Sequence, residues 1–371
     1  MADAPIARVG YVYNAKNEMD PLMTRRKASA TPDSAVDQPQ ERSRASVTSR
    51  DVARAAGVSQ ATVSRAFTPG SPVAPEVRQR ILDAAEQIGY RPNLLARSLI
   101  AGRSKLIGVV LSRQTNLLYP ELLYELSGRL TDLGYQMLLF AVREGESTRQ
   151  MVERIWSYRV DAVLGTGVLE PEDVELFQER GLPFVGFNRM YDQPVSSVSC
   201  DFAAGARDLV RRLAAKGARR FGLICGSIDS YVSGEVEAAV RMALTRIPDA
   251  EITLVRGEYT YEAGAALAGE LLGAMTPRPD AIICVNDTVA AGCLDHMRED
   301  LGMAVPDQAT VVAFETFAPS QWRSYAITGV RQPMQEMISA AVQLLMDRIE
   351  NNNLVVERRS YAPIFVQGRT G

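Results

Sequence analysis

The chain has 371 residues, of which 46% are hydrophobic and 23% are charged, and its formal net charge at pH 7 is -3. A chain of this length and apolar content can bury a large core and is expected to form two or three domains. The first residues lack the apolar core of an export signal, and no later stretch approaches the ~20 apolar residues that cross a bilayer, which argues against a membrane protein and predicts a cytoplasmic one.

The cysteines and the histidine argue against metal binding and catalysis. The four cysteines show no CxxC spacing and are expected to be free thiols inside the core: Cys200, Cys225, Cys284 and Cys293. The single histidine, His296, has no serine or cysteine nucleophile motif near it. The nearest approach to a dinucleotide-binding loop, Gly165 to Gly167, lacks the third glycine of GxGxxG. We therefore predict no metal, no cofactor and no catalytic residue, with an enzyme kept as a minor alternative.

Charge is divided unevenly along the chain. Residues 42–105 contain 11 Lys and Arg against 4 Asp and Glu, which is a net charge of +7. Subtracting this +7 from the total of -3 leaves -10 for the rest of the chain. A basic module joined to an acidic body favours nucleic-acid binding by the module.

The first 92 residues divide into an extension and a small helical domain. Residues 1–46 mix Pro, Ser, Ala and charged residues without periodicity, which predicts a disordered extension. Thr48 and Ser59 are suited to cap two short helices, and Gly57 permits the tight turn between them. A third helix is expected within residues 74–90, where apolar residues repeat on one side. This order is helix, turn, helix, followed by a supporting helix.

The second of these helices, Gln60 to Phe67, is expected to have two different faces. Val63 and Phe67 are four residues apart and should point into the core. The opposite face then carries small and polar residues, which would let the helix enter a major groove: Gln60, Ala61, Ser64 and Arg65.

From residue 105 onward, short β-rich runs alternate with amphipathic helical patterns. The runs cover 106–111, 135–142, 161–167 and 183–188, and then 220–226, 252–257, 281–286 and 310–315. This βαβ repetition predicts an α/β fold with two doubly wound parallel-sheet halves. Ligands of open α/β sheets collect at the carboxyl ends of the strands, so a small-molecule cleft is expected between the halves.

Three stretches of the sequence resemble the LacI/GalR family of bacterial transcription regulators: DVARAAGVSQATVSR (51–65), VRQRILDAAEQIGYRPNLLARSL (77–99) and SKLIGVV (104–110). The resemblance extends over 47–371 and implies an all-α helix-turn-helix domain followed by a type I periplasmic-binding-protein-like domain. It implies a homodimeric repressor that binds double-stranded operator DNA sequence-specifically. The affinity for the operator would be set by a small-molecule effector, which would be a sugar, a sugar acid or a nucleoside-like compound.

The resemblance also implies the domain boundaries. The extension would cover 1–46, the DNA-binding domain 47–92, the hinge helix and linker 93–104, and the effector-binding and dimerisation domain 105–371. Within the last domain, the N-terminal half is expected at about 106–202 plus 333–350, and the C-terminal half at about 203–331 plus 354–371.

Eleven positions match residues that contact DNA in that family: Thr48, Ser59, Gln60, Ala61, Thr62, Ser64, Arg65, Asn93, Ala96, Arg97 and Leu99. The Arg65 guanidinium would fork onto guanine O6 and N7. Leu99 would wedge open a base step in the minor groove. The simpler alternatives are solvent-facing polar residues on the second helix, and a linker helix in which Leu95 and Leu99 pack against the body.

Seven positions match residues that line the effector cleft: Tyr119, Asn188, Arg189, Ser230, Tyr259, Asp287 and Gln332. Their amide and carboxylate groups could bind hydroxyl groups, while a tyrosine ring covers a sugar or nucleoside ring. Asp287 could instead be the N-cap of the helix that starts there.

Two positions depart from the family pattern. Val236 stands where many members carry an arginine that grips the effector, and Glu315 stands where an aspartate is usual. A less polar effector therefore stays open, as does an effector-independent or activating regulator of the same family. A solute-binding protein with the same body fold is a further alternative, although it would have no use for residues 47–100. No membrane partner is expected.

Overall fold

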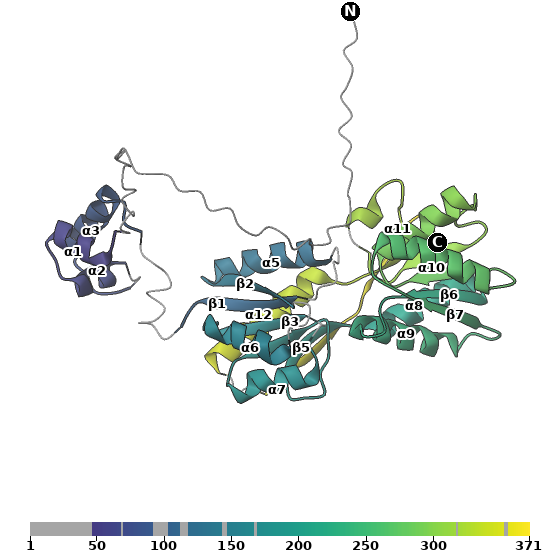
Figure 1. Ribbon diagram of the computed structural model, residues 1–371, viewed down its shortest axis with the longest axis horizontal. Helices are drawn as coiled ribbons and strands as arrows, with labels where there is room; N and C mark the ends of the chain where they lie inside the picture. The colour runs from purple at the N-terminus through teal and green to yellow at the C-terminus, as the bar shows by residue number, and fades with distance from the viewer. Residues whose placement is uncertain are drawn as a thin grey trace, which may run out of the picture. The chain divides into compact units, whose positions relative to one another are not determined.

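The computed structural model describes residues 47–67, 70–91, 103–111, 118–142, 147–166, 169–316, 318–351 and 355–371. The chain forms two compact units, one up to Pro92 and one from Asn93 (Figure 1). The predicted extension over 1–46 lies outside the described residues.

The first unit is a bundle of three helices, as the sequence predicts. Its helices are α1 (Ser49–Ala56), α2 (Gln60–Ala66) and α3 (Pro75–Gln87). Each contributes a side chain that is almost completely buried, and these are Val52, Val63 and Ile81. Gly57 ends α1 in the left-handed conformation, at φ 64°, which glycine adopts without a steric penalty. The tight turn predicted at this glycine is confirmed.

Two arginines of α3 bind the ends of the other two helices. Arg80 Nε donates to the carbonyl of Ala56, the last residue of α1, at 3.1 Å. Arg78 donates to the carbonyl of Ala66, the last residue of α2, and to that of Ser71 at 2.9 Å. The last carbonyls of a helix have no partner within it, so these contacts satisfy them and hold α1 and α2 against α3.

The second unit contains two sheets, each covered by helices on both faces. The first sheet has the strand order β11-β5-β4-β3-β1-β2, and all of its pairings are parallel. Its strands are β1 (Leu106–Leu111), β2 (Gln136–Ala141), β3 (Ala162–Thr166), β4 (Phe184–Phe187), β5 (Ser196–Cys200) and β11 (Arg358–Tyr361). One face packs on α5 (Leu118–Asp132) and α12 (Met334–Glu350), and the other packs on α6 (Thr148–Ser157) and α7 (Pro171–Glu179) (Figure 1).

The second sheet has the strand order β12-β10-β9-β8-β6-β7, in which β12 is antiparallel to β10. Its strands are β6 (Arg220–Cys225), β7 (Glu251–Arg256), β8 (Ala281–Cys284), β9 (Thr310–Ala313), β10 (Thr328–Arg331) and β12 (Ile364–Val366). One face packs on α8 (Phe202–Ala215) and α9 (Tyr231–Leu244), and the other on α10 (Tyr261–Ala274) and α11 (Asp287–Asp295). A π-helical turn (His296–Asp300) follows α11, and a short 3-10 helix (Ala318–Gln321) follows β9.

The predicted boundary of the C-terminal half needs one correction. Residues 354–371 were expected to belong to the second half, but Arg358–Tyr361 forms β11 and pairs with Ser197–Cys200 of β5 in the first sheet. The chain then passes to the second sheet, where Ile364–Val366 pairs with β10. Without β11, the edge of β5 away from β4 would have unpaired backbone groups. A short polar segment can pair with that edge, so no apolar run in the sequence reveals the strand.

The predicted apolar runs all contain strands, but β5 and β10 carry no such signal. β5 has the sequence SSVSC, and β10 has the sequence TGVR. Both are almost completely buried, apart from Arg331 at the end of β10. Their burial comes from the neighbouring strands and helices and is not visible in their own composition.

Candidate functional site

In the first unit, α2 has a buried face and an exposed face. Val63 and Ala66 are buried, whereas the residues on the opposite side are exposed: Gln60, Ala61, Ser64 and Arg65. Arg65 Nε donates to the Ala61 carbonyl at 3.3 Å, and Gln60 Nε2 donates to Ser49 Oγ of α1 at 2.9 Å. The two faces predicted for this helix are confirmed.

A carboxylate holds the start of α1, and a hydroxyl group holds the start of α2. Ser59 Oγ accepts from the backbone N–H of Thr62 at 3.1 Å and lies 2.8 Å from Thr62 Oγ1, so the predicted cap is confirmed. At α1, the Asp51 carboxylate accepts from the N–H of Thr48 at 3.0 Å and from its hydroxyl at 2.7 Å. The hydrogen bond from the Thr48 backbone lowers the pKa of Asp51, so this carboxylate is ionised at neutral pH.

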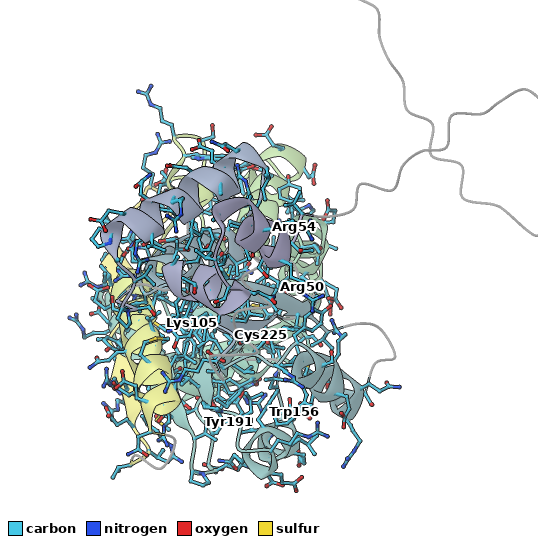
Figure 2. The ribbon with its side chains drawn as sticks, turned by 90° about the vertical axis from the view of Figure 1, so that its left-hand side faces the viewer. Arg50, Arg54, Lys105, Trp156, Tyr191 and Cys225 are labelled. Atoms are coloured by element: carbon cyan, nitrogen blue, oxygen red, sulfur yellow. The ribbon has the colours of Figure 1, made fainter. Side chains whose placement is uncertain are left out.

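Further basic side chains lie on the surface of α1. Arg50 and Arg54 are exposed, and Arg54 also lies 3.4 Å from the carboxylate of Asp51 (Figure 2). The predicted hinge residues Asn93, Ala96, Arg97 and Leu99 lie outside the described residues.

In the second unit, most of the predicted cleft residues follow the carboxyl ends of strands. Asn188 follows β4, Ser230 follows β6, and Tyr259 follows β7. Asp287 and Gln332 follow β8 and β10. Tyr119 lies in the first turn of α5, and its side chain is outside the described part of the chain.

Three of these residues make side-chain hydrogen bonds beyond the ends of the strands. Ser230 Oγ lies 2.6 Å from the hydroxyl of Tyr259, and Gln332 Nε2 donates to Glu315 Oε1. Burial raises the pKa of Tyr259 to about 12, and the charge of Glu315 adds to this shift. Glu315, Gln332 and Tyr259 are all buried.

Four buried polar atoms near the strand ends have no hydrogen-bond partner within the described residues: Asn188 Oδ1, Asn286 Nδ2, Thr316 Oγ1 and Gln332 Oε1. Leaving such an atom unsatisfied costs about 1–3 kcal/mol, so natural proteins tolerate it mainly where another group can bind. Asn188 also has a positive φ of 61°, a conformation that asparagine tolerates better than most residues. Asn286 and Thr316 were not predicted, although both lie within three residues of the end of a strand, which is the signal that could have identified them.

Arg189 makes several contacts within the protein. Its two terminal nitrogens donate to the carboxylate of Glu170 at 3.0 and 2.7 Å. The guanidinium also lies over the rings of Tyr191, at 5.3 Å, and Tyr231, at 4.8 Å. Tyr231 belongs to α9 of the second half, and its hydroxyl accepts from the N–H of Met190 at 3.3 Å. Arg189 therefore takes part in a contact between the two halves.

One further prediction is corrected by the structure. Asn286 is the N-cap of α11, since its Oδ1 accepts from the N–H of Val289 at 2.9 Å, so the cap interpretation of Asp287 is wrong. Asp287 is the first residue of the helix, is 2% exposed, and borders a hollow of about 110 Å³ with Tyr261 and Tyr325. Val236, the position that departs from the family pattern, is completely buried in the core.

All four cysteines are buried free thiols, as predicted, and burial raises the pKa of Cys200 to about 12 and that of Cys225 to about 11. In the part of the chain that is described, no three His, Cys, Asp or Glu side chains are grouped so as to hold a metal ion. Among the same residues, no helix has the length and apolar content needed to cross a membrane.

Comparison with known proteins gives two family matches. The family described as bacterial regulatory proteins, lacI family, matches residues 48–93, and the periplasmic binding protein-like domain matches residues 210–370. The HTH-type transcriptional regulator AscG of Escherichia coli K12 is 31% identical over 314 residues, which are 82% of this chain and 92% of AscG. Catabolite control protein A of Staphylococcus epidermidis is 27% identical, over 84% of this chain and 97% of its own length.

Solved structures agree with these matches. The lac repressor dimer, bound to operator and the anti-inducer ONPF, aligns with a TM-score of 0.79 at 22% identity, over 88% of this chain and 99% of the repressor. The complex of the transcriptional regulator CelR with cellobiose aligns with a TM-score of 0.66 at 26% identity, over 88% of this chain and all of CelR. The first of these likenesses concerns the fold alone, and the proteins named here are regulators of transcription, not enzymes.

Proposed function

This chain belongs to the LacI family of bacterial regulatory proteins, and we propose that it is a homodimeric repressor whose hold on operator DNA depends on a ligand in the cleft of its second unit. The observation that carries the DNA-binding part is the exposed face of α2, which is held in place by its Ser59 cap and by the arginines of α3. The dimer would act in the cytoplasm, on double-stranded DNA.

The residues proposed to read bases are Gln60, Ala61 and Arg65. Gln60 is already oriented by its bond to Ser49, and Arg65 keeps an exposed guanidinium on the same face. Thr48, Ser59, Thr62 and Ser64, together with the helix N-termini, would contact phosphate groups, which fix register without reading sequence. The basic charge of residues 42–105 supports this, because duplex phosphate supplies much of the affinity.

The proposed ligand is a small molecule with several hydroxyl groups, such as a sugar, a sugar acid or a nucleoside-like compound. The four unsatisfied polar atoms of Asn188, Asn286, Thr316 and Gln332 are both donors and acceptors, which suits hydroxyl groups because these can do both. The buried Tyr259 stays neutral at ordinary pH and would offer its ring as a face for the ligand. A relative, CelR, has been solved with cellobiose, which supports a sugar as the first class to test.

We further propose that the ligand acts through the orientation of the two halves. Residues 93–104 would form a hinge whose ordering on DNA depends on the spacing of the two subunits, with Asn93, Ala96, Arg97 and Leu99 as its DNA contacts. The contact of Arg189 with Tyr231 would favour one orientation of the halves. A coupling of about 1–3 kcal/mol changes DNA affinity about 5- to 150-fold.

The test is selection of genomic fragments by the purified protein, with and without sugars and nucleosides. We expect one near-palindromic sequence to be enriched, and its affinity to change with one ligand class. Arg65→Ala should relax the preference at one base pair of each half-site, worth about 1–3 kcal/mol, while Arg54→Ala, on α1, should weaken all sequences alike. Finding no enriched sequence under any condition, or an unchanged preference in Arg65→Ala, would overturn this assignment.

A further inference from the structure

The outer surface of the second half contains a hollow that the proposed cleft does not use. It has a volume of about 500 Å³ and lies between α8 and the end of α9, two helices that run side by side in this half (Figure 1). Its apolar wall is formed by Ala204, Val210, Ala243 and Ile247. A cavity of this size is typical of small-molecule sites. None of its lining residues belongs to the cleft.

Three arginines and one carboxylate stand around the apolar wall. The carboxylate of Asp208 is already bound, by Arg211 at 2.6 Å and by Arg212 at 2.8 Å. The side chains of Arg207 and Arg246 are exposed and have neither a hydrogen bond nor an ion pair with any residue that the structure describes. The lining therefore has two guanidinium groups whose charge nothing in the described protein balances.

This excess charge lies in a basic segment of an otherwise acidic body, since residues 207–220 contain six Lys and Arg and one Asp. Outside residues 42–105 the chain is acidic, with a net charge of -10. Two positive charges at one hollow repel each other, and a bound anion would relieve this repulsion. The hollow should therefore attract an anion more strongly than isolated surface arginines would. Arginine also offers planar paired donors, which match the oxygens of phosphate or carboxylate groups.

We propose that this hollow binds an organic phosphate monoester with a short apolar body. A phosphate monoester carries about -1.5 to -2 charges at pH 7, which matches Arg207 and Arg246 together, whereas a single carboxylate would balance only one of them. The apolar body would lie against Val210, Ala243 and Ile247, and the phosphate group would lie between the two guanidinium groups. This site is separate from the proposed cleft and does not depend on what the cleft binds.

The test is calorimetric titration of the full chain with phenyl phosphate at low salt. Inorganic phosphate carries the charge without the apolar body, and benzyl alcohol carries the body without the charge. The double variant Arg207→Gln/Arg246→Gln removes both guanidinium groups, and Arg149→Gln/Arg278→Gln removes the same charge from exposed positions elsewhere. Gln332→Leu alters the cleft alone, and circular dichroism checks that each variant folds.

We expect one molecule of phenyl phosphate per chain, at least tenfold weaker binding of inorganic phosphate, and no binding of benzyl alcohol. The Arg207/Arg246 variant should lose at least tenfold in affinity for phenyl phosphate, while the Arg149/Arg278 control and Gln332→Leu should bind as the parent does. The proposal is wrong if phenyl phosphate does not bind, if inorganic phosphate binds as tightly, or if only Gln332→Leu loses binding, since the last result would place the ligand in the cleft.

Discussion

Removal of the Tyr231 ring should loosen the contact between the two halves of the second unit. In the structure this ring lies 4.8 Å from the guanidinium of Arg189, which is only 8% exposed, and its hydroxyl accepts from the N–H of Met190 at 3.3 Å. Arg189 is also tied to Glu170 of the first half. Tyr231→Ala would remove both interactions across the boundary and leave the arginine bound to its own half.

The size of the effect follows from these two interactions. A cation–π contact is worth about 0.5 kcal/mol when exposed and about 2 kcal/mol when desolvated, and this one is largely buried. A hydrogen bond between neutral groups adds about 0.5–1.5 kcal/mol. Together they favour the described orientation of the halves by about 1–3 kcal/mol, which is about 5- to 150-fold in the ratio of the two orientations.

The assay is single-molecule energy transfer between one dye on each half. Glu175→Cys and Glu270→Cys provide exposed labelling positions, and the four native cysteines are buried and should not react. In Tyr231→Ala the ratio of molecules with the described separation to molecules with the other separation should fall by the factor given above. Tyr231→Phe keeps the ring and loses only the hydroxyl, so its effect on this ratio should be smaller than that of Tyr231→Ala.

Two results would refute this reasoning. One is an unchanged distribution of distances in Tyr231→Ala. The other is a double-mutant cycle in which Arg189→Ala and Tyr231→Ala act independently, because residues in direct contact should couple by at least about 0.5 kcal/mol.

Three further predictions concern single side chains. Ser59→Ala should destabilise the first unit by about 0.5–2 kcal/mol in denaturant unfolding, whereas Ser59→Asp should restore the cap, and equal losses in both would contradict a capping role. Tyr259 keeps its proton up to about pH 12 when folded and loses it near pH 10 when unfolded, so its stabilising effect is complete below pH 10 and disappears between pH 10 and 12. Between pH 10 and 12 the unfolding free energy of Tyr259→Phe should therefore fall by up to about 3 kcal/mol less than that of the parent protein. Parallel curves for the two proteins would exclude this titration. Gln332→Leu removes a buried acceptor that has no partner in the described structure, together with the amide that donates to Glu315, so it should abolish the response to the ligand while operator binding without ligand stays within twofold in a gel-shift assay.

Much of the first unit could be predicted from the sequence, because its signals are local. Ser59 bonds to an N–H only three residues away, and Gly57 adopts a conformation that glycine alone adopts easily. The longer strands were also predictable, since a buried parallel strand needs a continuous apolar run. The strand β11 was assigned to the wrong half because its pairing with β5 joins segments about 160 residues apart, and no local pattern records that partner.

The sequence by itself determined the kind of protein: a helix-turn-helix module with an exposed reading face, joined to a doubly wound body with polar residues at its strand ends. Tertiary structure alone decided what those polar residues do, because their partners come from distant segments. Arg189 is bound to Glu170 and covered by Tyr231 of the other half, whereas Gln332 and Asn188 each keep a buried atom without a partner in the described protein. Whether a polar side chain is satisfied or left open to a ligand depends on what the folded chain places within hydrogen-bond distance, and spacing along the chain does not contain that information.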